Sequence, residues 1–238
     1  IRAMMYHKIG SVVVLGTDNL LISSFVGIYW VGIYSNYVMI IGMVTTFIQQ
    51  FSQALVASIG NLVSTETTVK AKETFDLLYF LNFWIYAFCT ICFMTLFNPF
   101  ITVWIGTEYL FNRWIVLIIV VNFYISGMRQ NVLSFRNSLG LFWYDRYKPI
   151  AEALINLVAS IVLLKYWGIA GVFFGTLIST VTTSLWVEPY ILFKHYFKSG
   201  LISYFKKYIL YLTITSTICL IMQAVQKCLF DGSISSLI

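Results

Sequence analysis

WIVLIIVVNFYISGMRQNVLSFRNS, residues 114–138, is an apolar segment long enough to cross a bilayer as a single helix. A hydrocarbon core about 30 Å thick needs about 20 helical residues. Arg129 and Arg136 nevertheless lie inside the segment. Because an ionised group has a high free energy in hydrocarbon, such charges usually face a cavity or a partner. The segment therefore predicts a membrane span that also carries a function.

The composition of the whole chain agrees with a membrane protein. Of its 238 residues, 60% are hydrophobic and only 10% are charged, and the mean hydropathy is +0.85. A soluble domain carries about 25% charged residues. The apolar segments have helical length, so we expect helices rather than a barrel. The net charge of +6 comes from basic residues in short connections, so nucleic-acid binding is not expected.

The fold class that we predict is all-α, a polytopic transmembrane bundle of about seven spans. The second span is long enough to tilt or to project from the membrane. The seven predicted spans are 9–28, 33–63, 77–97, 114–138, 149–166, 168–192 and 208–226. We assign residues 1–192 to a six-helix lobe. Residues 193–238 would hold a basic interfacial segment, an additional helix and the start of a truncated one at 232–238.

The distribution of lysine and arginine predicts the orientation of the chain. One side of the bundle receives only Arg113, Lys165 and Lys227, whereas the other side is much richer in lysine and arginine. By the positive-inside rule the richer side, with the N-terminus of the chain, is cytoplasmic. The stretch 64–76, STETTVKAKETFD, is predicted to be a soluble loop on that side, and 194–207 to lie among lipid headgroups. The basic residues of the richer side are Arg2, Lys8, Lys70, Lys72, Arg146, Lys148, Lys194, Lys198, Lys206 and Lys207.

Asn122, Arg129 and Arg136 recur at spacings of seven, which places them on one helical face. Gln130 and Asn137 broaden this polar stripe. A guanidinium group stays charged and binds two oxygens at once, so the stripe suits a phosphate group. The alternative is that Arg129 pairs with an acid or with backbone carbonyls and only fixes the packing. Both interpretations remain open at this point.

Asp18 and Asn19 lie near the middle of the first predicted span. Asp18 could pair with a buried arginine, carry H⁺ or Na⁺ for coupling, or contact a substrate. In the second span, Gln49 and Gln53 share a stripe, where amides hydrogen-bond sugar hydroxyls or join helices.

Other features point away from an enzyme. The histidines, His7 and His195, lie in basic flanks without an acid placed to form a catalytic pair, and no cofactor or metal motif is present. We interpret Cys89 and Cys92 as small apolar residues that fill space in the packing of the helices. In the sixth span, small residues at every fourth position predict a packing ridge without chemistry, formed by Gly171, Gly175, Ser179 and Thr183.

Several stretches together resemble Wzx-type polysaccharide flippases. They are GTDNLLIS at 16–23, VGIYSNY at 31–37, NPFITVWIG at 98–106, and the run 147–176 with EALIN at 152–156 and GIAG at 168–171. The resemblance implies the multidrug/oligosaccharidyl-lipid/polysaccharide exporter superfamily. Its members have two six-helix lobes around a central cavity with alternating access. This chain would then be the second lobe plus an extra helix, and an N-terminal lobe of the same protein would complete the cavity.

The resemblance further implies a substrate, an undecaprenyl-diphosphate-linked oligosaccharide, which is moved from the cytoplasmic to the outer leaflet of the bacterial inner membrane for O-antigen or capsule synthesis. Arg129 and Arg136 resemble cavity cations for the diphosphate, and Asp18 with Asn19 matches a polar pair of the family. The alternatives are a drug/cation antiporter of the same superfamily, and a non-transporting membrane protein of glycan assembly.

Overall fold

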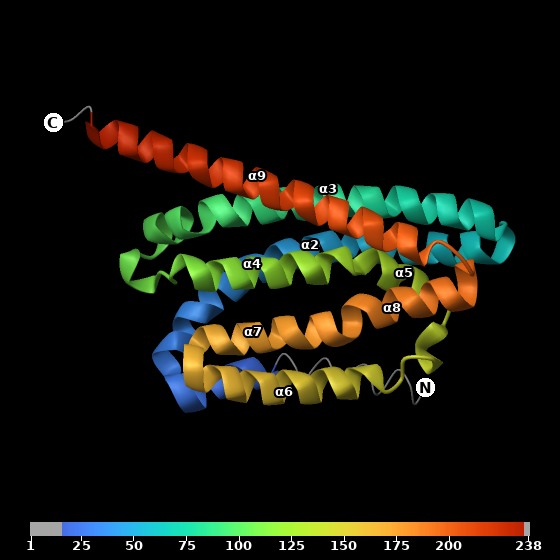
Figure 1. Ribbon diagram of the computed structural model, residues 1–238, viewed down its shortest axis with the longest axis horizontal. Helices are drawn as coiled ribbons and strands as arrows, with labels where there is room; N and C mark the ends of the chain where they lie inside the picture. Colours follow the sequence, from blue (N-terminus) through green and yellow to red (C-terminus); the bar gives the residue numbers. More distant parts are fainter. Residues whose placement is uncertain (1–15, 236–238) are drawn as a thin grey trace.

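A computed structural model describes residues 16–235 of the chain, with side chains described up to residue 228 (Figure 1). Every regular element in this range is helical. Residues 16–21 form a helical turn that continues into η1 (Ile22–Val26). The remaining elements are α2 (Ile28–Thr65), α3 (Thr68–Trp104), η2 (Thr107–Tyr109), α4 (Arg113–Met128), α5 (Gln130–Ser138), η3 (Leu141–Trp143), α6 (Lys148–Trp167), α7 (Ile169–Ser179), η4 (Thr180–Ser184), α8 (Leu185–Leu192), η5 (Phe193–Phe197) and α9 (Leu201–Ser235).

Six helices of the described range are long and apolar enough to cross a membrane, which confirms an all-α, multi-pass bundle. Six of the seven predicted spans correspond to them. The first, 9–28, lies largely outside the described residues, and its described part is helical. The six spans are Ile28–Thr65, Thr68–Trp104, Arg113–Ser138, Lys148–Trp167, Ile169–Phe197 and Leu201–Cys228.

The loop predicted at 64–76 is wrong, because α2 and α3 are separated only by residues 66 and 67. Thr67 begins α3 as its N-cap, and its hydroxyl accepts a hydrogen bond from the backbone N–H of Lys70 at 3.4 Å. Lys72 pairs with Asp76 one turn further on, at 2.6 Å. Such pairs four residues apart stabilise a helix that extends beyond the apolar core. The stretch is therefore polar because this part of α3 extends beyond the apolar core, and not because it forms a loop.

The connections alternate between the two ends of the bundle (Figure 1). At the right of Figure 1 lie the connections 66–67, 139–147 and 198–200; we call this the basic end. It holds the described residues of the lysine- and arginine-rich set, whereas Arg2 and Lys8 lie outside the described residues. The cytoplasmic orientation of this end stays a prediction. The predicted domain boundary at 192 falls inside the continuous span Ile169–Phe197, and α9 runs unbroken from Leu201 to Ser235, into the stretch predicted to start a further span.

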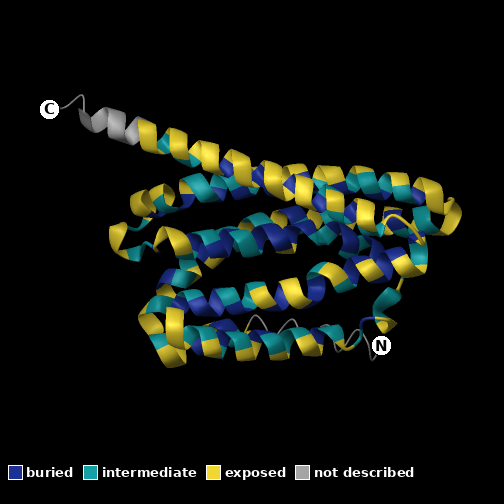
Figure 2. Cartoon of the chain, viewed as in Figure 1, coloured by how far each residue is buried: buried dark blue, intermediate teal, exposed yellow. Residues whose placement is uncertain are grey.

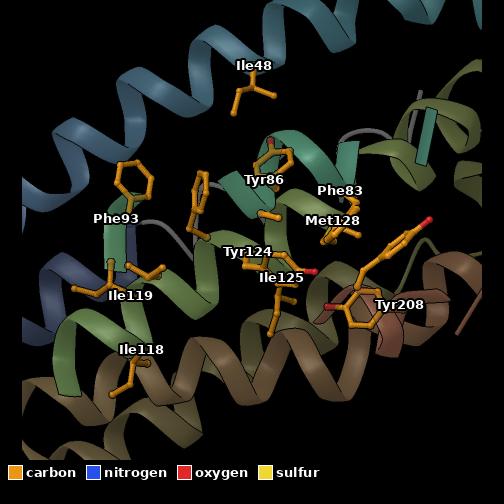
Figure 3. Close-up of a cluster of buried hydrophobic side chains, with 14 of the residues drawn as sticks. Ile48, Phe83, Tyr86, Phe93, Ile118, Ile119, Tyr124, Ile125, Met128 and Tyr208 are labelled. Atoms are coloured by element: carbon orange, nitrogen blue, oxygen red, sulfur yellow. The ribbon is translucent and has the colours of Figure 1, made fainter. Parts of the chain in front are cut away.

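The core is centred on α4, which Figure 2 shows as the most deeply buried of the helices, while α9 lies over α3 with much of its surface exposed. Gly127 permits the closest contact: a Cβ atom there would lie 2.0 Å from the ring of Tyr86. Figure 3 shows aromatic and aliphatic side chains of α3, α4 and α9 packed in this core, among them Phe83, Tyr86, Ile118, Ile119, Tyr124, Ile125, Met128 and Tyr208.

α6 and α7 pack so closely that backbone meets backbone, as the predicted small-residue ridge requires. Gly168 makes the turn between them with a φ of +56°, a left-handed conformation that favours glycine. A Cβ at Gly171 would lie 2.3 Å from the backbone of Leu163, and one at Gly175 would lie 2.1 Å from Ser160 Oγ. The hydroxyl of Ser160 donates to the carbonyl of Val172 at 3.2 Å. This close contact fixes α6, which carries polar residues of the site described below, against α7.

We expect Gly175→Ala to lower the free energy of unfolding by about 1–3 kcal/mol, because the new methyl group overpacks the contact with Ser160. Gly42→Ala is the matched control, since nothing lies within 4 Å of a Cβ at that position of α2. Alanine in a helix interior is favoured over glycine by about 0.5–1 kcal/mol, so the control should unfold no earlier than the wild type. Thermal unfolding in detergent measures both, and equal midpoints would contradict the packing described.

Candidate functional site

Arg129 lies at the break between α4 and α5, where the helix makes a turn before it resumes. Its guanidinium group binds both carboxylate oxygens of Glu188 in α8. The distances are 3.0 Å from Nε to Oε2 and 2.7 Å from Nη2 to Oε1. The Glu188 side chain is only 1% exposed. This two-pronged arrangement is the strongest geometry that an arginine and a carboxylate adopt.

Two residues of α6 join this pair. Lys148 Nζ lies 2.6 Å from Glu188 Oε1 and 3.0 Å from Glu152 Oε2. Glu152 in turn lies 3.9 Å from Arg129 Nη1, and accepts a hydrogen bond from the Ser184 hydroxyl at 2.8 Å. Arg129, Lys148, Glu152 and Glu188 therefore form one connected set between α5, α6 and α8.

Arg136 extends the set toward the basic end. Its guanidinium group forms a buried ion pair with Asp145, which precedes α6, and lies 4.0 Å from Glu188 Oε1. It also donates to Asn137 Oδ1 at 3.2 Å. We call the six charged residues Arg129, Arg136, Asp145, Lys148, Glu152 and Glu188 the ion cluster. Three cations face three carboxylates, so the cluster carries no formal net charge.

The span that supplies Glu188 is irregular around this residue. The wide π turn η4 ends at Ser184, the residue that donates to Glu152. Pro189 follows Glu188 and has no N–H, so one backbone hydrogen bond of the helix is missing beside the carboxylate. π turns inside α-helices are rare and often occur at functional sites. Here the irregular turns direct Ser184 and Glu188 toward the cluster.

A polar groove of about 240 Å³ lies between α2 and α5, next to the cluster. It brings the predicted residues Gln49 and Gln53 together with Gln130 and Asn137. Asn137 belongs to both places, since its amide oxygen accepts from Arg136. The residues that line the polar groove are Gln49, Ser52, Gln53 and Val56 from α2, with Gln130, Leu133, Ser134 and Asn137 from α5. The groove thus offers amides and hydroxyls and no charged side chain.

The remaining predicted residues lie elsewhere. Asn122 donates to the carbonyl of Phe173 at 3.0 Å and so joins α4 to α7. Asp18 is buried and accepts a hydrogen bond from Thr176 at 3.3 Å, while Asn156 donates to the same Thr176 hydroxyl at 3.0 Å. Within residues 16–235 Asp18 forms no ion pair, because the buried arginines are paired with other acids. Asn19, beside it, is exposed.

Compared with protein-family models, curated proteins and solved structures, the chain matches none. Its chemistry has to be inferred from the residues themselves. Among the described residues, no group of three His, Cys, Asp or Glu side chains could hold a metal ion. The cysteines Cys89, Cys92 and Cys219 are free and at least partly buried, in keeping with a filling role.

Sequence reasoning missed the carboxylates of the cluster. Glu188 stands in the apolar stretch LWVEPYIL, so the rule that identified Arg129 as a charge within hydrocarbon also applies to it. Glu152 enters the sequence analysis only within the stretch EALIN, and Lys148 only among the basic residues of the richer side. The signal that could have found the cluster is that Glu152 and Glu188 lie within the apolar segments 149–166 and 168–192, as Arg129 and Arg136 lie within 114–138. Opposite charges within apolar helices are expected to form ion pairs with one another.

We expect Glu188→Gln to destabilise the protein by about 3–5 kcal/mol, because it leaves buried cations without their carboxylate. The control is Glu66→Gln, which removes an exposed ion pair with Lys70 and should change stability by less than about 1 kcal/mol. Replacing both partners, Arg129→Met with Glu188→Leu, should recover part of the loss, since Lys148 keeps Glu152. Thermal unfolding in detergent checks all three, and equal effects of Glu188→Gln and Glu66→Gln would refute a stabilising cluster.

Proposed function

We propose that the chain is the second lobe of a flippase that moves an undecaprenyl-diphosphate-linked oligosaccharide across the bacterial inner membrane for surface polysaccharide synthesis. The observation that carries the proposal is the polar groove between the apolar helices α2 and α5, lined by Gln49, Gln53, Gln130 and Asn137. Amide groups donate and accept hydrogen bonds at once, as sugar hydroxyls do. Helices that only anchored a protein would have no need of such a surface.

The groove carries no charge, so it suits the glycan part of the substrate. The two arginines of the polar stripe, Arg129 and Arg136, are proposed to bind a different part of the substrate. In the described conformation Arg129 and Arg136 are held by Glu188 and Asp145. We propose that they contact the diphosphate in another state of the transport cycle, with Lys148 retaining Glu188. Alternating access requires at least two conformations, and exchange of carboxylate for phosphate oxygens would favour one of them.

Asp18 is proposed to couple transport to H⁺ or Na⁺. Its carboxylate is buried, has no cationic partner within residues 16–235, and is held by a single hydroxyl, that of Thr176. A buried carboxylate in this setting gains from binding a proton or a cation. Because Thr176 also accepts from Asn156, a change at Asp18 reaches the packed pair α6 and α7 directly.

The alternative transporter, a drug/cation antiporter, needs a different surface. A site for lipophilic cations favours acids and aromatic rings, whereas the residues that line the polar groove include neither. A non-transporting protein of glycan assembly would not require polar groups along the depth of the spans. In the proposed assembly, the basic end is cytoplasmic and an N-terminal lobe of the same protein supplies the other half of the cavity.

Transport of a fluorescent undecaprenyl-diphosphate-linked oligosaccharide in vesicles tests the proposal, with the full-length protein reconstituted. Gln49→Ala with Gln53→Ala should slow flipping about ten- to thirtyfold, the equivalent of losing two hydrogen bonds of about 1 kcal/mol each. The control is Gln50→Ala, because Gln50 is exposed next to the groove without lining it. A protein that does not flip this lipid at all, or equal rates for the two variants, would overturn the proposal.

The coupling role predicts that Asp18→Asn removes the dependence of flipping on an imposed proton or sodium gradient. The variant keeps the size of the side chain and can still bond to Thr176, so folding should be retained. Asn19→Ala changes the exposed neighbour and should keep the gradient dependence. If wild type and Asp18→Asn respond equally to the gradient, Asp18 is not the coupling residue.

A further inference from the structure

Three buried tyrosine hydroxyls lie between α3, α4 and α9 without a hydrogen-bond partner among the described residues. They belong to Tyr79 of α3, Tyr124 of α4 and Tyr208 of α9, and these residues are at most 6% exposed. Figure 3 shows Tyr124 and Tyr208 in the core. A buried hydroxyl without a partner raises the free energy of the folded state, so native proteins satisfy such groups with protein atoms or with ordered water.

The three hydroxyls gather at one place, together with that of Tyr204 in α9. Tyr79 interacts electrostatically with Tyr204, Tyr208 and Tyr124. The Tyr79 and Tyr204 hydroxyls approach each other without reaching hydrogen-bond geometry, and so do those of Tyr124 and Thr215. We call Tyr79, Tyr124, Tyr204 and Tyr208 the tyrosine cluster. Polar groups that meet without a direct hydrogen bond are the setting in which a bridging water is expected.

Aromatic rings form the contact between α3 and α9. The ring centroid of Tyr79 lies 4.9 Å from that of Tyr204 and 5.5 Å from that of Tyr211, and Phe83 stacks on Tyr211 at 4.1 Å. Such large side chains keep the two backbones apart, in contrast to the glycine contacts of α6 with α7. The hydroxyls at the tips of the rings are therefore positioned by ring packing and not by bonds to one another.

The tyrosine cluster borders the ion cluster. Tyr204 interacts electrostatically with both Glu188 and Arg129, and Tyr208 interacts with Arg129. Arg129 donates to Glu188 through Nε and Nη2, whereas its Nη1 lies 3.9 Å from Glu152, too far for a hydrogen bond. Within the described residues, Arg129 therefore keeps N–H donors that no acceptor takes up. These donors and the tyrosine hydroxyls belong to one polar region inside the bundle.

We propose that the tyrosine cluster holds a small group of ordered water molecules, next to the Arg129–Glu188 pair. Water both donates and accepts hydrogen bonds, and buried waters typically satisfy polar groups that the protein leaves unpaired. A hydrocarbon chain in the same place would leave the hydroxyls without partners. The waters would join α9 to the polar interior of the bundle and hydrate the ion pair from that side. The inference is independent of the proposed substrate.

X-ray radiolysis of the wild-type protein in detergent tests the proposal, because it converts bound water into hydroxyl radicals that modify the side chains beside it. Tyr79 and Tyr37 are a matched pair, since both are 0% exposed. The Tyr37 hydroxyl is satisfied by protein, donating to Asn98 Oδ1 at 2.9 Å and accepting from the backbone N–H of Phe111 at 3.0 Å. We expect modification of Tyr79 to be several times faster than that of Tyr37, measured by mass spectrometry of peptides. Equal rates would overturn the proposal.

Phenylalanine variants provide a second test, because a shared water and a dry pocket predict opposite results. With bound water, Tyr79→Phe and Tyr124→Phe should each lower the thermal midpoint by about 2–4 °C, and the double variant should lose less than the sum. In a dry pocket each variant would remove an unpaired hydroxyl and leave the midpoint unchanged or higher, which would overturn the proposal. Fully additive losses would also overturn it, since hydroxyls that share water cannot lose it twice.

Tyr86→Phe is the matched control. The Tyr86 hydroxyl is also buried without a partner among the described residues, but its electrostatic neighbour is Cys89 of the same helix and not another tyrosine. We expect this variant to unfold no earlier than the wild type. A loss equal to that of Tyr79→Phe would show that the effect does not come from the tyrosine cluster, and would refute the inference.

Discussion

The carboxylate of Glu188 is the interaction on which the rest of the structure depends. It receives the guanidinium group of Arg129 and the ammonium group of Lys148, and it is almost completely buried. The side chains of the ion cluster are at most 15% exposed, so a charge that loses its partner stays largely desolvated and each charge needs the others. The cluster therefore links α5, α6 and α8 to one another. Since α6 is packed against α7 by glycine contacts, α7 is also joined to this group of helices.

This balance of charges changes what the arginines can do. An unpaired Arg129 would make the neighbouring surface an anion site, but three carboxylates offset the three cations. What remains free is the uncharged polar groove, in which amides and hydroxyls are available for hydrogen bonds. On the other side of the contact between α2 and α5, Phe47, Phe51, Leu55 and Leu81 line an apolar groove. The two sides of α2 therefore differ in character, with amides and hydroxyls on one side and apolar side chains on the other.

Much of the fold follows from local patterns. Apolar runs of helical length predict the spans, and glycine and serine at every fourth position predict the contact of α6 with α7. The break at Arg129 does not follow, and neither does the helical start of α3, where paired charges make a helix look like a loop. Local composition cannot distinguish a solvated helix end from a loop.

Only part of the candidate site could be predicted from the sequence. The polar character of Gln49, Gln53 and the arginine stripe is visible in the sequence, since such residues are rare in apolar helices. The contact between these residues cannot be predicted from the sequence, because α2 and α5 are far apart in the chain and their relative rotation depends on packing. The sequence also cannot show that Glu188, and not Asp18, pairs with Arg129. Either carboxylate could neutralise the guanidinium group, and only the tertiary arrangement decides between them.

The central claim is that α2 separates a water-accessible polar groove from a lipid-facing apolar one. Thiol labelling with a membrane-impermeant maleimide tests it most directly, in full-length protein in vesicles whose native cysteines are replaced by alanine. Gln53→Cys places a thiol in the polar groove, and Leu55→Cys places one two residues away in the apolar groove. The account predicts that the first reacts and the second does not. Equal reactivity at the two positions would contradict it.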